Sequence, residues 1–394
     1  MVSETNLQFG TFDWGYVDPN NGPSPQASVL GPDELTDAIL GHPGWTFDSR
    51  EESIQLQQKF TWFLGDHTMK VGAEMISSSF DLRAGGNPNG NYQIKLTESQ
   101  LATVREAGLG AELDIDDIAS VLGPENIEVL NYNVELREAA FGETQNIYGL
   151  WVEDAWSVTP RLNLTLGLRY DLDNLSEGAS DSADTDNWAP RLSANYQLDE
   201  SSALRFGAGM FYDKIVYAIY SDALQQNTRT EGYATQIRAL VDRGLLPDDT
   251  QVDQVLFDGN VVASFRDEYD FLAAPTAEDL QGQEEQVFSN ERRILNPNGY
   301  ENPYTVQFTA GYQRQLRNDL LFYVDLIYNR GYHLPRLRNL NAPEPWIVTP
   351  DTPPSEAVRT PEEADATRPL ADLGAIPGGA RNIVMTEMQG ESEY

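Results

Sequence analysis

The sequence contains no cysteine, and this absence removes several kinds of site at once. Disulfide scaffolds, thiolate zinc sites and cysteine nucleophiles all need a thiol. Basic residues are also scarce, because 26 Lys and Arg stand against 62 Asp and Glu, which gives a net charge of -36. Proteins that bind nucleic acid neutralise phosphates with clusters of Lys and Arg. We therefore expect no nucleic-acid partner and a fold held together by strand pairing and packing.

Long hydrophobic runs are missing as well. No stretch of about eighteen apolar residues occurs, which excludes a membrane-spanning helix. In a transmembrane barrel, lipid-facing and lumen-facing residues alternate, so a low mean hydropathy, here -0.46, is compatible with one. Residues 1–5 show neither the basic nor the apolar part of a signal peptide, so we expect a truncated or processed chain without one.

What the sequence does contain is a series of paired segments that alternate apolar and polar residues and are joined by short polar turns. Alternation with a period of two indicates strands with two different faces. The pattern predicts hairpins at residues 54–80, 145–171, 188–213 and 304–329. Shorter and weaker strand signals lie at residues 7–14 and 382–388.

The two faces of these strands predict two environments. In the hairpin at residues 145–171, one face of the returning strand carries a leucine row that we expect to face lipid: Leu162, Leu164, Leu166 and Leu168. Asp154 interrupts the apolar face only near a turn, where charge costs roughly 0 to 1 kcal/mol. The opposite face is too polar for a dry core, and we expect it to line a lumen.

Three arginines stand on the polar faces and are predicted to face the lumen: Arg169, Arg191 and Arg205. They could contact a plug or an anionic substrate. The simpler interpretation, which we favour, is pairing with carboxylates of neighbouring strands.

Aromatic residues give a second signal, because Tyr and Trp gather at the two interfaces of a membrane. Counted from the turns, at a rise of about 3.3 Å per residue, they fall at two heights. The expected belts comprise Tyr148, Tyr170, Tyr212 and Tyr328 far from the turns, and Trp156, Tyr196 and Tyr312 nearer to them.

Long connections alternate with the short turns, at residues 81–141, 171–187, 214–300 and 331–381. Bacterial barrels have short periplasmic turns and long external loops. Helical spacing is visible at residues 98–107 and 235–243. The expected fold class is therefore all-β, an antiparallel transmembrane β-barrel with long extracellular loops that contain short helices.

Residues 148–171, YGLWVEDAWSVTPRLNLTLGLRYD, resemble the signature hairpin of TonB-dependent receptors of the Oar-like type. Residues 187–198, 302–316 and 324–341 are similar to later strands of that barrel. The resemblance implies a bacterial outer-membrane barrel of about 22 strands with a plugged lumen. It also implies outer-membrane lipid and the TonB system as partners, and uptake of a scarce ligand such as an iron chelate, cobalamin, a saccharide or a peptide.

The chain departs from that family pattern in its extent. No plug domain and no TonB box are recognisable, and roughly half the strands of the family barrel can be counted. We therefore expect residues 1–394 to be one barrel segment of such a receptor, without a plug domain.

Residues that could carry chemistry are few, and we predict no enzyme, no cofactor and no metal site. His42, His67 and His333 lack the spacing of a metal site or a catalytic triad. The acidic cluster Asp114, Asp116 and Asp117 departs from the calcium-loop pattern, so we favour a solvated acidic loop. Two other functions remain open: a passive porin-like channel, and a secreted β-rich adhesin whose apolar faces form an internal core.

Overall fold

The structure is a computed structural model, and it describes residues 1–16, 24–41, 44–87, 89–108, 113–137, 139–353 and 359–393. Among these residues the larger sheet has eleven strands in the order β1-β4-β5-β8-β9-β10-β11-β14-β15-β16-β13. Their bounds are β1 (Val2–Tyr16), β4 (Trp45–Leu64), β5 (His67–Gly86), β8 (Ala139–Thr159), β9 (Leu162–Asp173), β10 (Trp188–Asp199), β11 (Ser202–Tyr212), β14 (Tyr304–Arg317), β15 (Leu320–Asn339), β16 (Ala380–Glu393) and β13 (Ser289–Ile294).

The hairpins predicted from the alternation are all present as antiparallel neighbours: β4 with β5, β8 with β9, β10 with β11, and β14 with β15. The two weaker strand signals also correspond to strands, β1 and β16. Most strands extend beyond the predicted limits at the end away from the turns. The strands stay paired in these extensions, although polar residues and glycines interrupt the alternation of apolar and polar residues there.

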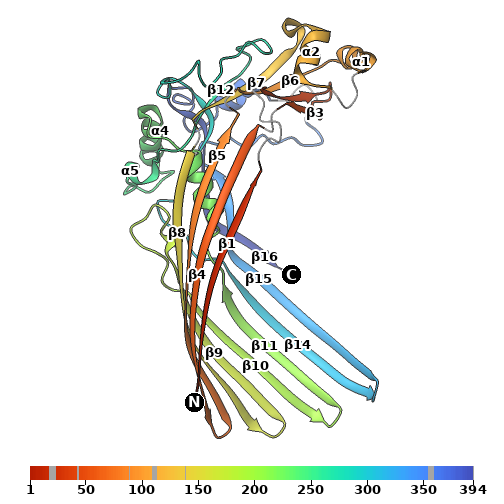
Figure 1. Cartoon of the computed structure of the whole chain (residues 1–394), viewed down its shortest axis with the longest axis vertical. Coiled ribbons are helices and arrows are strands. Elements are labelled where there is room, and N and C mark those ends of the chain that lie inside the picture. Colours follow the sequence, from red (N-terminus) through yellow and green to blue (C-terminus); the bar gives the residue numbers. More distant parts are fainter. Residues whose placement is uncertain are drawn as a thin grey trace.

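The larger sheet is curved and open (Figure 1). Its tight turns lie at one end, together with the start of β1, and its long connections lie at the other. Within the described residues β1 and β13 form the two outer edges and do not pair with each other. The sheet is antiparallel except for β13, which runs parallel to β16. Closure of the barrel therefore stays a prediction.

The long connections contain a second sheet that the sequence did not predict. Its order is β12-β7-β6-β2-β3. The strands are β12 (Val261–Phe265), β7 (Glu128–Arg137), β6 (Asn91–Lys95), β2 (Gln26–Leu30) and β3 (Thr36–Gly41). The expectation of loops with only short helices was too simple, because most of these strands are about five residues long and pair with strands of other connections.

The connections also carry α1 (Glu98–Glu106), α2 (Ile115–Leu122), α3 (Tyr217–Gln225), α4 (Glu231–Asp242), α5 (Val252–Val255) and α6 (Pro361–Asp365), with short 3-10 turns at Pro124–Asn126 and Asn174–Glu177. The first and fourth of these helices lie over the two stretches with helical spacing. No helix among the described residues is long and apolar enough to cross a membrane.

The acidic cluster at residues 114–117 was expected to be a solvated loop. Asp114 and Asp116 are exposed to solvent, but the segment is not a loop. It starts helix α2. The Asp114 side chain accepts a hydrogen bond from the Asp117 backbone N–H, and the Asp117 side chain accepts one from the Asp114 N–H. Asp116 and Asp117 also place negative charge at the positive end of the helix dipole. The cluster is therefore a helix-start signal.

Two hydrophobic cores are found among the described residues, and both lie at the end of the long connections. One surrounds α3 and α4 and includes Ile237 and Leu240. The other joins α2 to the smaller sheet and includes Ile94, Ile118 and Tyr132. We call the antiparallel part of the larger sheet the wall. The described parts of the long connections, including residues 24–41 between β1 and β4, form the cap together with β13. The wall between the turns and the cap has no core of this kind.

Candidate functional site

The strand register places the predicted leucine row on one apolar face of the wall. Leu166 lies opposite Asp154 of β8 and Leu192 of β10, and Leu168 lies opposite Val152. Leu162 and Leu164 continue the same face. Leu166 and Leu168 are exposed, at 46% and 40%, because no layer of the described part of the chain covers them. The structure thus brings the row together, and its contact with lipid stays a prediction.

The charged interruption of the apolar face has a partner that the sequence did not reveal. Nδ1 of His67 lies 2.7 Å from Oδ2 of Asp154. The His67 ring stacks on Trp156, with 5.2 Å between the ring centroids. The first residue of β5 therefore covers Asp154 near the turn end of the wall.

Some of the aromatic residues predicted to form belts take part in local ring clusters, and the belts themselves stay a prediction. Tyr170 contacts Trp188, and Tyr212 contacts Tyr304, which in turn stacks on Tyr332. Tyr148 lies in the middle of β8, opposite Leu172 at the cap end of β9. Nearer the turns, Trp156 pairs with Leu164, and Tyr196 and Tyr312 both lie opposite Leu204. Tyr328 lies beside Phe308 instead of joining the Tyr212 cluster. Sequence reasoning overlooked Trp188 and Tyr332 as members.

On the opposite, polar face, Arg169 is held by two carboxylates. Its Nη2 lies 2.7 Å from Oδ1 of Asp171 and 3.1 Å from Oε2 of Glu74 on β5. Gln55 of β4 donates a hydrogen bond of 2.6 Å to the other oxygen of Glu74. This network joins β4, β5 and β9 across the intervening β8, which agrees in kind with the strand-to-strand pairing that we favoured from the sequence. Arg205 behaves in the same way, because its Nη2 lies 3.0 Å from Oδ1 of Asp325 on β15.

Arg191 differs from the other two arginines. Within the described ranges it makes no ion pair, and its guanidinium lies over the ring of Phe211, 4.4 Å from the centroid. The carboxylates that act on it through space, Asp171 and Glu153, are already engaged with Arg169 and Lys70. The carboxylates nearest to Arg191 therefore already form ion pairs with other cations.

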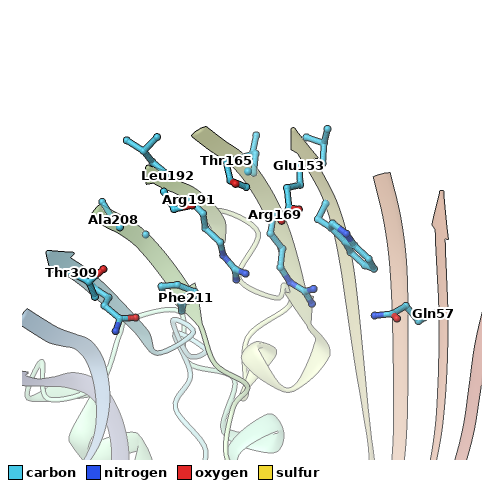
Figure 2. A pocket seen from close by; sticks show the side chains of 17 residues that line it. Gln57, Glu153, Thr165, Arg169, Arg191, Leu192, Ala208, Phe211 and Thr309 are labelled. Carbon is cyan, nitrogen blue, oxygen red and sulfur yellow. The ribbon is translucent and has the colours of Figure 1, made fainter. Parts of the chain in front are cut away.

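Arg191 and Arg169 line a cavity of about 460 Å³ on this polar face (Figure 2). Its lining runs from Gln57 of β4 to Thr309 of β14, so the wall curves around it and the polar face is the concave one. Figure 2 shows the two arginines on the cavity side and Leu192 directed away from them. The alternation of the strands thus separates a polar side, which curves around this cavity, from an apolar side.

Glycines on the polar face allow large side chains to lie flat against the wall. A Cβ on Gly72 would come within 2.1 Å of the Trp151 ring, and one on Gly149 within 2.4 Å of the Arg169 guanidinium. Gly311 gives the same close approach to Asp325. Bulky groups therefore pack along the strands, and space remains on the concave side.

No arrangement for metal or acid–base chemistry is evident in the part of the chain that the structure describes. No group of three or more His, Asp or Glu side chains there is placed to hold a metal ion. His333 pairs with Glu301, with 3.1 Å between Nε2 and Oε2. His42 lies outside the described residues.

Comparisons with known proteins agree with this architecture. A family described as outer membrane beta barrel domain matches residues 4–183 and 176–394. TonB-dependent transporter Oar of Myxococcus xanthus is 27% identical over 167 residues, which cover 39% of this chain and 14% of that protein. The structure of the outer membrane transporter YddB of Escherichia coli is similar to this chain, with 9% sequence identity and a TM-score of 0.50. The match covers 99% of this chain and 36% of the YddB chain. The ferric enterobactin receptor PfeA of Pseudomonas aeruginosa matches with 13% identity, 99% and 37% coverage and a TM-score of 0.44.

The extent of these matches limits what they say about activity. The chain spans only 14% of the length of Oar and 36% of that of YddB. At 9% identity, the likeness to YddB concerns the fold alone. These relatives are named as transporters or receptors, not as enzymes.

Proposed function

Because the chain belongs to the outer membrane beta barrel domain family, we propose that it forms part of the wall of a TonB-dependent transporter. It is a protein of the bacterial outer membrane. The transporter would take up a scarce small ligand, of the iron-chelate, saccharide or peptide class, with energy from the TonB system. The observation that carries this proposal is a curved wall whose strands place apolar residues on one face and polar residues on the other, with the polar face concave around Arg169 and Arg191.

In this proposal the leucine row of β9 faces lipid and the alternate residues face the lumen. The test uses single cysteines in a chain that has none of its own. Leu164→Cys and Leu166→Cys should react with a lipid-soluble maleimide and resist a water-soluble one. Thr165→Cys, the residue between them, is the matched control and should show the opposite preference. Labelling of Leu166→Cys from water alone would reverse the assignment of the faces.

Arg191 has a defined role in this proposal. Its neighbouring acids are occupied, so it remains available to a carboxylate of a plug or to an anionic ligand on its way through the lumen. Arg169 and Arg205 instead stabilise the wall through their carboxylate partners.

The wall by itself has open edges, and this bears on what the isolated chain can do. Unpaired N–H and C=O groups at the edge of a sheet cost several kcal/mol each in lipid, and only closure or further pairing removes them. We therefore propose that the plug and the remaining strands of a closed barrel belong to a longer protein. The uptake of ligand is a property of that whole protein.

The experiment that separates a transporter segment from a passive porin is a flux measurement. The purified chain is refolded in detergent, reconstituted in liposomes and tested for swelling in arabinose. We expect β-rich protein without arabinose flux. A monomeric species that migrates differently after heating and admits arabinose would show that these residues suffice for a small pore. The adhesin alternative is less favoured, because no second layer of the described protein covers the apolar face of the wall.

A further inference from the structure

A second cavity, of about 470 Å³, lies in the cap and is separate from the concave face of the wall. Different connections contribute to its lining. Asn131 comes from β7, Phe265 and Arg266 from the end of β12 and the residue after it, and Arg381 from the start of β16. Cavities of roughly 300 to 1,000 Å³ are typical of sites for small molecules. Its size and its walls therefore fit a small ligand.

Cationic side chains gather at this cavity in a chain that is otherwise strongly acidic. Arg266, Arg368 and Arg381 surround a single carboxylate, Asp365, at the end of α6. Of these residues, Arg266 and Arg381 line the cavity, whereas Arg368 and Asp365 lie behind its wall, and the one acid in the lining is Glu268. Guanidinium groups thus outnumber the carboxylates here, whereas acidic residues outnumber basic ones by more than two to one in the whole sequence.

The arginines are bound to Asp365 to different degrees. Arg368 is only 10% exposed, and it bonds Asp365 at 2.7 Å, the backbone oxygen of Asn341 and the side chain of Asn382. Arg381 lies 3.2 Å from Asp365 and donates to Asn290. Arg266 is 37% exposed, and its Nη1 lies 3.9 Å from Asp365, at the limit of an ion pair. Arg266 therefore keeps most of its hydrogen-bonding capacity for another anion.

Aromatic rings complete the wall of the cavity. Phe265 and Tyr269 meet edge to face, with 5.1 Å between their centroids. The Arg381 guanidinium lies 5.2 Å from the centroid of Phe288. Rings of this kind provide contact area for a flat apolar body, and a guanidinium provides paired donors for a carboxylate.

We infer that this cavity binds a small aromatic anion, whose carboxylate is held by Arg266 and Arg381 and whose ring packs against Phe265 and Tyr269. This inference rests on the proposed function and names the chemical class of the ligand that the cap would capture. Because Arg368 and Arg381 hold Asp365, changing Arg266 should remove binding without separating the connections.

The test measures binding directly on the purified full chain in detergent by fluorine NMR. The probes are 4-fluorobenzoate and 4-fluorobenzamide, which have nearly the same shape and differ in charge. We expect saturable binding of the benzoate and at least tenfold weaker binding of the benzamide. R266Q should weaken benzoate binding about tenfold, because a charge-assisted contact is lost. R238Q is the matched control: Arg238 is an exposed cap arginine that pairs with Glu231 outside the cavity, and this variant should bind like the parent.

R266K is the control for folding, because it keeps the positive charge but loses the paired donors of the guanidinium, so it should weaken benzoate binding by less than R266Q does. Equal binding of both probes would overturn the inference. So would unchanged binding in R266Q, or equal loss in R266Q and R238Q. Since no transport step is involved, such a result would leave the liposome test of the proposed function untouched.

Discussion

Hydrophobic side chains are buried in the cap but exposed on one face of the wall. In the cap, Ile237 and Leu240 are fully buried in a core made by the protein itself. In the wall, Leu326 and Phe308 lie exposed on a face that no protein layer covers. Burial of apolar area away from water drives the folding of a core such as that of the cap. A sheet in lipid instead requires that its backbone N–H and C=O groups are paired. One chain therefore combines a cap that buries apolar side chains in its own cores with a sheet whose apolar face stays open.

The largest effect is expected where the cap depends on its own core. Leu240→Ala should lower the free energy of unfolding of the cap by about 2 to 5 kcal/mol, because it removes buried methyl groups and leaves a cavity. Leu35→Ala is the same truncation at an exposed cap position and should change stability by less than about 0.5 kcal/mol. Urea titrations followed by limited proteolysis of the cap measure both. Equal effects would mean that the cap has no core of its own.

The next effect distinguishes the two faces of the wall. Leu166→Arg should destabilise the sheet in liposomes by about 2 to 4 kcal/mol, the cost of an arginine that faces lipid near the middle of the bilayer. Thr165→Arg, one residue away on the concave face, should have a much smaller effect, because its side chain remains in a polar cavity. Urea unfolding from liposomes, followed by tryptophan fluorescence, gives both values. If Thr165→Arg is the more harmful change, the apolar face does not contact lipid.

The same contrast explains which parts of the fold the sequence could predict. In the wall, the partner of a strand is usually the next strand, joined by a turn of two residues, so the hairpin β8–β9 follows from local alternation alone. In the cap, β2 pairs with β6 and β7 pairs with β12, across connections far apart in the sequence. Most of these strands have only five or six residues, too few for an alternation long enough to detect, even where a partner such as β3 for β2 is close in the sequence.

The candidate sites show the same limit. Alternation was enough to place Arg169, Arg191 and Arg205 on one face. It did not predict the ion pair between Arg205 and Asp325, which lies on β15. Nor did it predict that Arg191 makes no ion pair among the described residues and lies over the Phe211 ring instead. The cap cavity depends on residues from several connections, and only their packing brings them together.

The smallest expected effect is a pH dependence of the cap. Burial raises the pKa of Asp222 on α3, and its ion pair with Arg293 offsets this only in part. The Asp222 carboxyl therefore takes up a proton at a higher pH in the folded cap than in the unfolded chain. As a result, the free energy of unfolding should rise as the pH falls from the folded pKa of Asp222 toward its ordinary value of about 4. Asp222→Asn should lose this component, whereas Asp372→Asn, at an exposed partner of Arg243, should keep it. Urea titrations of the cap between pH 4 and pH 7 measure the slopes. Parallel slopes for the parent and Asp222→Asn would show that Asp222 titrates alike in the folded and unfolded states.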